Sequence, residues 1–321
     1  MASPSPTPRT SFFVILVMLF MISVPAVFTL RTARVATQVP GRLIESSPYG
    51  YTVSLLLFLV PIATILLWLV PSEHLKISKR AFLWTIAALV PLGIAADFFF
   101  AHLFFTFPNT GAVLGILAPA LGHWVPVEEY IFYLTGFMAV LLLYIWLDEY
   151  WLAAYSVAND SAERSEFKRL VQFHPQSLIL AGVLIVAAIL IRRFLVPGDG
   201  GFPGYFTYLV VVGLTPSVAF FPTALPVVNW RACSLTLFFI LLVSLLWEAS
   251  LASPYGWWGY QQARMMGVYI TAWNHLPIEA VVVWIAVTYA TVIVYEIIRR
   301  WKASNRPMRR AFLGPRAADG K

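Results

Sequence analysis

The chain has 321 residues, of which 60% are hydrophobic and only 12% are charged, and its mean hydropathy is +0.78. A soluble domain is usually about 45–50% apolar and about 25% charged, so this composition indicates an integral membrane protein. The single cysteine, Cys233, excludes an internal disulfide. The net charge of +7 does not indicate nucleic-acid binding, because much of it lies in the C-terminal tail.

Eight apolar runs approach or exceed the length of about 17–25 residues that spans a bilayer. Each run predicts a helix, because a chain in lipid must satisfy its own backbone hydrogen bonds. The first run follows Arg9 and has the alternative of a secretory signal, but it is longer than the usual apolar core of about 7–15 residues. We therefore expect a retained helix there. The expected spans are 11–30, 51–70, 80–105, 127–149, 175–195, 204–226, 230–252 and 276–298.

The charges outside these runs predict how the protein is oriented. Residues 151–174 are polar and of mixed charge, and residues 303–321 are expected to be disordered. Eight spans place both termini on one side, and the basic tail assigns that side to the cytoplasm of a multi-pass protein in the cell membrane. Lys76, Lys79 and Arg80 agree with this orientation, whereas the arginines at 31, 34, 42, 192 and 193 fall on the other side.

An internal repeat is indicated by two Pro-x-Glu sequences, Pro126-Val127-Glu128 and Pro277-Ile278-Glu279, which lie 151 residues apart (279 − 128). Asp97 and Glu248 precede the two glutamates by 31 residues each (128 − 97 and 279 − 248). The same offset relates the second to fourth spans to the sixth to eighth. We therefore predict an all-α membrane protein of about eight transmembrane helices, with two parallel three-helix repeats, a linking helix and an extra N-terminal helix.

The corresponding organisation has five parts. Residues 1–50 form an N-terminal helix and loop, 51–152 the first repeat, and 153–201 a polar loop with the linking helix. Residues 202–302 form the second repeat, and 303–321 form the basic tail.

Acidic residues inside spans are functional candidates, because a charge at the bilayer centre costs at least ~2.5–3.5 kcal/mol. Burial favours the neutral form of Asp97 and Glu248, which could then donate a proton or merely bond a neighbouring helix. Glu128 and Glu279 follow a proline, so they could simply begin helices, where an acid meets the positive end of the dipole. Their shared spacing favours a paired acid and base set.

Aromatic residues are dense between these acids, and they suit either an interfacial belt or the wall of an apolar cavity. Ring faces attract cations, so such a cavity would suit a carbocation. The chain has neither a GxGxxG sequence at a strand-to-helix turn nor a phosphate-binding loop, so no dinucleotide cofactor is expected. We expect no metal.

Four motifs resemble a known family. Trp247-Glu248, Pro254-Tyr255-Gly256-Trp257-Trp258 and Leu276-Pro277-Ile278-Glu279 look like one half of the heterodimer-type lycopene cyclases, whose module also occurs in archaeal and fungal fused cyclases. Val125-Pro126-Val127-Glu128-Glu129 resembles the Pro-x-Glu-Glu motif of that family. The resemblance covers about residues 51–300. Two residues depart from the family pattern. Ala280 stands where a second acid often follows the motif, and Ala96 stands where the other half has the tryptophan Trp247.

The resemblance implies a carotenoid end-group cyclase that protonates, cyclises and deprotonates a linear carotenoid such as lycopene, forming β- or ε-type rings without a cofactor. It implies proton transfer by Glu128 and Glu129, with Glu279 equivalent and Asp97 and Glu248 in support. Trp124, Phe132, Trp247, Trp257 and Trp258 would contact the substrate. Other enzymes of the carotenoid pathway are expected partners besides the bilayer. The alternatives are a proton-coupled transporter, a diverged isoprenoid-modifying enzyme and a non-catalytic membrane partner.

Overall fold

The computed structural model describes residue 20, residues 48–69, 71, 77–157, 174–196, 201–304 and 307–313. Seven helices in these residues are long and apolar enough to cross a membrane, which confirms a mostly helical, multi-pass membrane protein. The expected first span at 11–30, most of the polar segment 151–174 and most of the tail lie outside the described residues.

The seven spans lie close to their expected positions. They are Gly50–Leu67, Lys79–Phe104, Val127–Trp151, Gln176–Phe194, Gly204–Ala224, Trp230–Ala252 and Ile278–Ala303. The agreement follows from hydropathy, because the apolar runs are bounded by prolines, polar side chains and charges. The last span differs most, since it continues to Ala303 beyond the expected end at 298.

Several spans change helical pitch along their length. α2 (Gly50–Thr64) continues as the π-helix η1 (Ile65–Leu69), and α5 (Val127–Trp146) as η3 (Leu147–Trp151). α8 (Gly204–Tyr208), η5 (Leu209–Leu214) and α9 (Thr215–Ala224) form one span. α10 (Trp230–Trp247) continues as η6 (Glu248–Ala252). α4 (Lys79–Phe104), α7 (Gln176–Phe194) and α11 (Ile278–Ala303) remain regular, and α12 (Met308–Leu313) is short.

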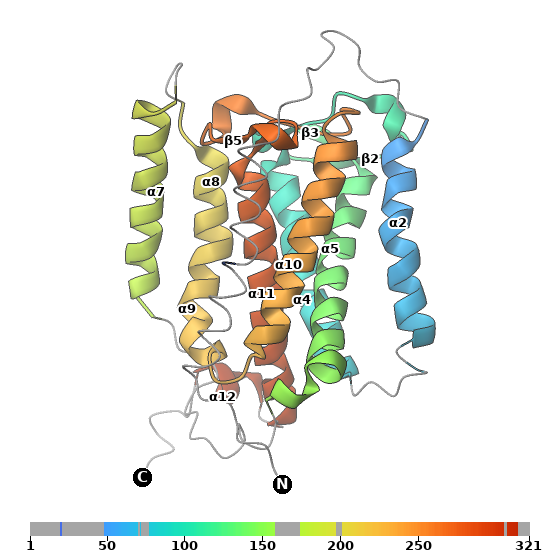
Figure 1. Ribbon diagram of the computed structural model, residues 1–321, viewed down its shortest axis with the longest axis vertical. Helices are drawn as coiled ribbons and strands as arrows, with labels where there is room; N and C mark the ends of the chain where they lie inside the picture. Colours follow the sequence, from blue (N-terminus) through green and yellow to red (C-terminus); the bar gives the residue numbers. More distant parts are fainter. Residues whose placement is uncertain are drawn as a thin grey trace.

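The helices form a bundle around four central members. α5 and α11 pack against each other, and each also packs against both α4 and α10. α2 lies beside α5 at one edge of the bundle, and α7 lies beside α9 at the opposite edge (Figure 1). The largest buried apolar cluster gathers around α5, α10 and α11 and includes Tyr144 and Tyr295, each at most 1% exposed.

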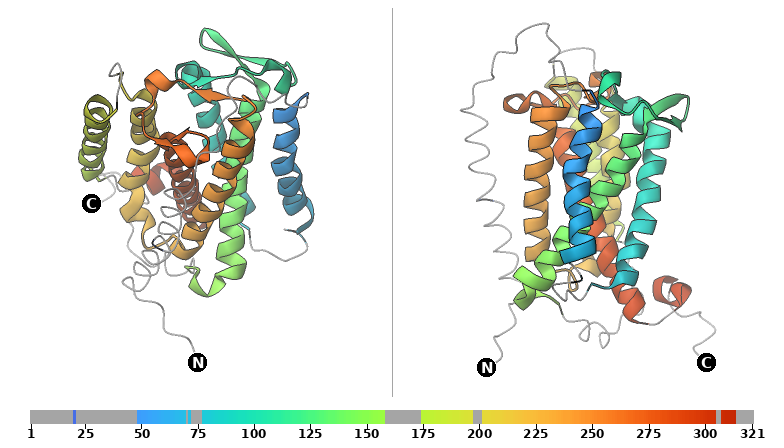
Figure 2. Two further views of the ribbon diagram at one scale, coloured as in Figure 1. Left: turned by 45° about the horizontal axis from the view of Figure 1, so that its top comes forward. Right: turned by 90° about the vertical axis from the view of Figure 1, so that its right-hand side faces the viewer.

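Short strands and turns cover one end of the bundle, here called the loop end, which consists of residues 105–126 and 253–277 (Figure 2). β2 (Leu117–Ala120) pairs with β3 (His123–Pro126), and β5 (Tyr269–Ile270) pairs with β6 (Leu276–Pro277). β1 (Phe105–Thr106) pairs with β4 (Gly259–Tyr260), so the two loops are joined to each other. The short 3₁₀ turns are η2 (Thr110–Ala112), η4 (Ala153–Tyr155), η7 (Gln262–Arg264) and η8 (Thr271–Trp273), of which η4 lies outside the loop end.

Equivalent contacts recur 151 residues apart. Ser78 caps α4 by accepting a hydrogen bond from the Ala81 amide, and Asn229 caps α10 through the Ala232 amide. The hydroxyl groups of Thr85 and Thr236 then donate to the carbonyls of Ala81 and Ala232, at 2.8 Å in both cases. α5 and α11 begin at positions that differ by the same 151 residues (278 − 127).

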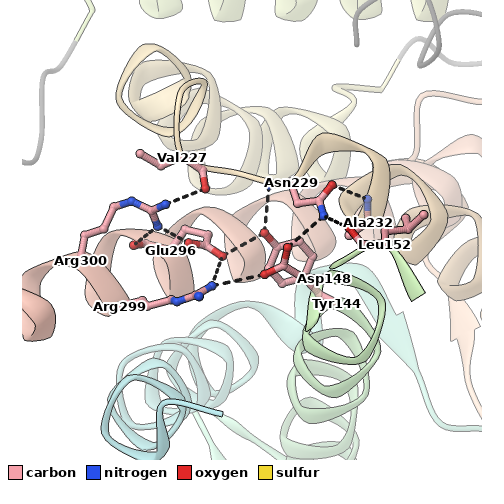
Figure 3. A network of polar contacts seen from close by, with 9 residues as sticks. All are labelled: Tyr144, Asp148, Leu152, Val227, Asn229, Ala232, Glu296, Arg299 and Arg300. Carbon is pink, nitrogen blue, oxygen red and sulfur yellow. Dashed lines mark hydrogen bonds and ion pairs between the residues drawn. The ribbon is translucent and has the colours of Figure 1, made fainter. Parts of the chain in front are cut away.

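A buried polar network, here called the far network, joins α5, α10 and α11 at the end opposite the loops (Figure 3). Arg299 forms an ion pair with Asp148 at 3.3 Å, and Arg300 forms one with Glu296. Tyr144 donates to Glu296 at 2.9 Å, and the Asn229 amide donates to Asp148 at 2.9 Å. These partners explain why α11 continues through its arginines, because each buried cation meets an acid.

Replacing Arg299 with alanine should destabilise the protein by on the order of 3 kcal/mol, because Asp148 loses its ionic partner while remaining buried. Thermal unfolding in detergent, followed by tryptophan fluorescence, measures the change. Adding Asp148→Asn should restore part of the loss by removing the unpaired charge. Lys79→Ala, at an exposed position, is the control. An Arg299→Ala melting temperature equal to that of the control would contradict the role of the ion pair.

Candidate functional site

The five acidic residues singled out by the sequence all lie in the part of the bundle next to the loop end. Glu128, Glu129 and Glu279 stand in the first turns of α5 and α11, where the helix N-termini favour negative charge. Asp97 lies in the last two turns of α4, and Glu248 begins η6 at the end of α10. Each is buried, with at most 7% of its surface exposed.

Glu128 and Glu279 hold the loops on the helix starts. Glu128 accepts hydrogen bonds from the Leu114 amide at 2.8 Å and from the Thr52 hydroxyl at 2.6 Å. Glu279 accepts one from the Met266 amide at 2.5 Å. Backbone N–H donors stabilise a carboxylate that burial would otherwise disfavour. The geometry that the two Pro-x-Glu sequences share is thus a helix start that binds the preceding loop.

Glu129 and Glu248 receive hydrogen bonds from aromatic side chains instead. The Tyr51 hydroxyl of α2 donates to Glu129 at 2.7 Å. The Trp258 indole donates to Glu248 at 3.3 Å, and the Tyr260 hydroxyl donates to the same oxygen. These two carboxylates are therefore bound by side chains rather than by loop amides. Asp97, Glu128 and Glu248 are the acidic neighbours of Glu129.

Asp97 differs from the other four because neither of its oxygens makes a hydrogen bond of ordinary geometry. The Tyr133 hydroxyl is the side-chain donor that interacts with it most closely. Tyr133 can pack on α4 there only because residue 93 is glycine, since a Cβ at Gly93 would lie 2.8 Å from the tyrosine ring. A buried carboxyl group that has no donor at ordinary hydrogen-bond geometry is suited to the protonated form.

A cavity of about 70 Å³, here called the central chamber, lies between the central helices. Glu129 and Glu248 both line it, and the rest of its wall is mainly aromatic and aliphatic. A second cavity of about 170 Å³ contains Asp97 and shares part of its wall with the chamber. The side chains common to both cavities are Phe105, Tyr133, Phe137, Tyr205, Val283 and Val287.

Tyr260 is placed at the chamber by the pairing of β4 with β1, which sets Tyr260 opposite Phe105. Burial, together with the nearby Glu248 carboxylate, raises the pKa of Tyr260 well above its usual range. The hydroxyl therefore stays protonated at neutral pH and remains a donor to Glu248. Tyr269 lies outside the chamber, and burial also raises the pKa of its hydroxyl.

Of the five aromatic residues predicted to bind substrate, three line cavities and two do not. Phe132 and Trp258 line the central chamber, and Trp247 stacks on Phe132 with ring centroids 5.8 Å apart and lines an adjoining cavity. Trp257 instead stacks on Tyr51, and its indole nitrogen has no hydrogen-bond partner. Trp124 stands on β3 with 66% of its surface exposed, outside the cavities.

Several residues of the site were not predicted as functional. Tyr51 and Tyr260 supply the donors to the two chamber carboxylates, Tyr133 faces Asp97, and Trp284 forms part of the chamber wall. The density of aromatics around Tyr260 was a signal in the sequence, but nothing in the sequence pairs Tyr51 with an acid 78 residues away. Among the residues that the structure describes, no group of three or more His, Cys, Asp or Glu side chains could hold a metal ion.

Neither family models, nor curated proteins, nor solved structures gave a match to this chain. The class of protein is therefore defined by fold and site alone. It is a multi-pass helical membrane protein with three buried carboxyl groups beside adjoining apolar, aromatic cavities.

Replacing Glu128 with alanine should free the Leu114 amide, and Glu279→Ala should free the Met266 amide, at a cost of about 1–3 kcal/mol each. Hydrogen exchange measured by mass spectrometry should show faster exchange only in the loop that each glutamate binds. Each variant therefore serves as the control for the other loop. Glu129→Gln should leave both loops protected, and equal exchange in wild type and Glu128→Ala would contradict the clamp.

Proposed function

We propose that the protein is a membrane carotenoid cyclase of the lycopene type, which forms β- or ε-ionone end groups without net redox change. The observation that carries this proposal is the position of Asp97, Glu129 and Glu248, three buried carboxyl groups beside adjoining cavities whose walls are otherwise apolar and aromatic. Proton transfer to a hydrocarbon requires an acid and a base in a site that excludes water.

The chemistry divides among these groups according to their partners. Asp97, whose oxygens accept no hydrogen bond of ordinary geometry, is the proton donor to a terminal double bond of the substrate. The resulting carbocation is attacked by a second double bond, which forms the ring carbon–carbon bond and moves the positive charge along the chain. Glu129 or Glu248 then accepts a proton from the ring, so no oxidant or reductant is needed. Hydrogen bonds from Tyr51 and from Tyr260 favour the ionised form of these acceptors.

The aromatic walls support the cationic intermediate. Phe132, Trp258 and Trp284 present rings to the central chamber. The negative face of an aromatic ring attracts a cation, by roughly 2 kcal/mol or more where water is excluded. The same walls disfavour the transporter alternative, since transport would need polar groups distributed along a path.

The roles of the two Pro-x-Glu glutamates change under this proposal. Glu128 and Glu279 act as positioning residues that fix the loops over the site, rather than as the groups that transfer the proton. Of the two residues to which the resemblance assigns proton transfer, Glu128 and Glu129, we keep only Glu129 in that role, because only Glu129 lines the chamber.

We also infer that the bundle arose as two parallel three-helix repeats. The caps, threonine contacts and helix starts that recur at an offset of 151 residues support this. The linking helix is α7. The far network lies at the end that carries Lys79, Arg80, Arg231 and Lys302, which supports a cytoplasmic C-terminus in the cell membrane.

Expression in cells that accumulate lycopene, followed by chromatography of the pigments, tests the activity. Wild type should convert lycopene to ring-bearing carotenoids. Asp97→Asn should lower ring formation by about 100-fold or more, because it removes the proton donor. Of Glu129→Gln and Glu248→Gln, the variant that removes the proton acceptor should lower ring formation to a similar extent, which identifies the acceptor. If lycopene remains unchanged although the wild-type protein is present in the membrane, the proposed activity is wrong.

Two further variants separate the roles of the acids. Glu149→Gln, in the same span but at the opposite end, is the matched control and should retain activity. Glu128→Gln should retain activity in proportion to the folded protein. If the Glu128→Gln variant reaches normal levels in the membrane but forms no rings, then Glu128 itself transfers the proton and its assignment as a positioning residue is wrong.

A further inference from the structure

On one side, the central chamber adjoins a row of two further cavities between α2, α5 and α10, here called the α2 arm. The first, of about 190 Å³, shares Phe132, Gly136 and Trp284 with the chamber. The second, of about 350 Å³, shares Phe58, Ala139 and Leu143 with the first. The walls carry no acidic or basic side chain. The α2 arm is therefore a row of adjoining apolar cavities that leads from the carboxylates to the gap between α2 and α5.

On the other side, the cavity that contains Asp97 lies between α4, the α8–η5–α9 span and α11, and is here called the Asp97 arm. It adjoins the chamber through Tyr133 and Tyr205. Both arms reach the outside of the bundle at exposed apolar side chains, Leu57 for the α2 arm and Leu92 for the Asp97 arm, each 65% exposed. These positions lie within spans, so both openings face lipid.

The two arms occupy equivalent positions in the two halves. Four residues of α11 line the Asp97 arm, Val283, Ala286, Val287 and Ala290. Subtracting 151 from each number gives residues of α5 that line the α2 arm, Phe132, Thr135, Gly136 and Ala139. The same holds for α4 and α10, because Leu89, Leu92, Gly93 and Ala96 correspond to Ile240, Val243, Ser244 and Trp247.

The arms differ where they meet the chamber. The wall of the Asp97 arm has Gly93 and Ala96, where the α2 arm has Ser244 and Trp247. Small side chains beside a donor acid leave room for a branched end group that must fold into a ring. The bulkier wall of the α2 arm, followed by its second cavity, suits a thin extended chain.

We propose that one long linear hydrocarbon enters sideways from the bilayer and occupies both arms, with its reacting end against Asp97 and the remainder in the α2 arm. This rests on the proposed function for the identity of the reacting end, but the binding mode does not depend on turnover. The chain passes Glu129 and Glu248 in the chamber, where the acceptor of the ring proton is required. The substrate class is therefore a linear polyene longer than the chamber, with a methyl-branched end group that fits beside Asp97, rather than a short isoprenoid.

Ala139 and Ala290 offer a matched pair of tests, because they are the same residue at equivalent positions in the two arms. Lycopene binding to the purified protein in lipid nanodiscs can be followed by quenching of tryptophan fluorescence. Ala139→Phe and Ala290→Phe should each weaken binding about tenfold or more by filling an arm. Val183→Phe adds the same ring on the exposed face of α7 and should bind as wild type does.

The outcomes separate this inference from the proposed activity. If either arm variant binds lycopene with wild-type affinity, the binding mode is wrong, and that arm is occupied by lipid chains only. If the wild-type protein does not bind lycopene, the binding mode is wrong as well. Binding that both arm variants weaken, without ring formation by wild type, would support the two arms and contradict the cyclase. Melting temperatures establish that the variants fold, and Ala139→Leu and Ala290→Leu replace any phenylalanine variant that does not.

Discussion

The cost of keeping carboxyl groups inside a lipid-embedded bundle determines how the loop end is built. A lone charge there is disfavoured by several kcal/mol, so each acid needs donors or a proton. Glu128 and Glu279 take theirs from loop amides, which requires the loops to fold back onto the starts of α5 and α11. Glu129 and Glu248 take theirs from tyrosine and indole groups. The short strands hold the loops that carry most of these donors, and α2 carries Tyr51.

Hydropathy predicted the described spans well, because apolar length is a direct physical requirement of the bilayer. The span expected at 230–252 is Trp230–Ala252 in the structure. The end of α11 was placed five residues too early, since Arg299 and Arg300 resemble the polar exit of a helix. Their partners Asp148 and Glu296 come from elsewhere on α5 and from α11 itself, and only the packed bundle shows that these charges are paired.

The candidate site was predicted in composition but not in orientation. Spacing identified four of the acids, and the resemblance to the Pro-x-Glu-Glu motif added Glu129. Adjacent residues on a helix point about 100° apart, so the sequence could not decide whether Glu128 or Glu129 faces the cavity. Trp124 was expected at the substrate because it precedes the motif, but the β2–β3 hairpin holds it outward. Contacts between distant residues, such as Tyr51 with Glu129, depend on helix packing that no local pattern specifies.

The ion pair between Asp148 and Arg299 joins positions that are 151 residues apart. In the two-repeat organisation that we propose, it therefore joins corresponding sites of the two halves. Two copies of the first half arranged in this way would bring Asp148 against Asp148, and two copies of the second would bring Arg299 against Arg299. Buried like charges repel, whereas the unlike halves attract. Divergence at this one pair of positions therefore favours assembly of a first half with a second half and selects against self-pairing, whether the halves share one chain or not.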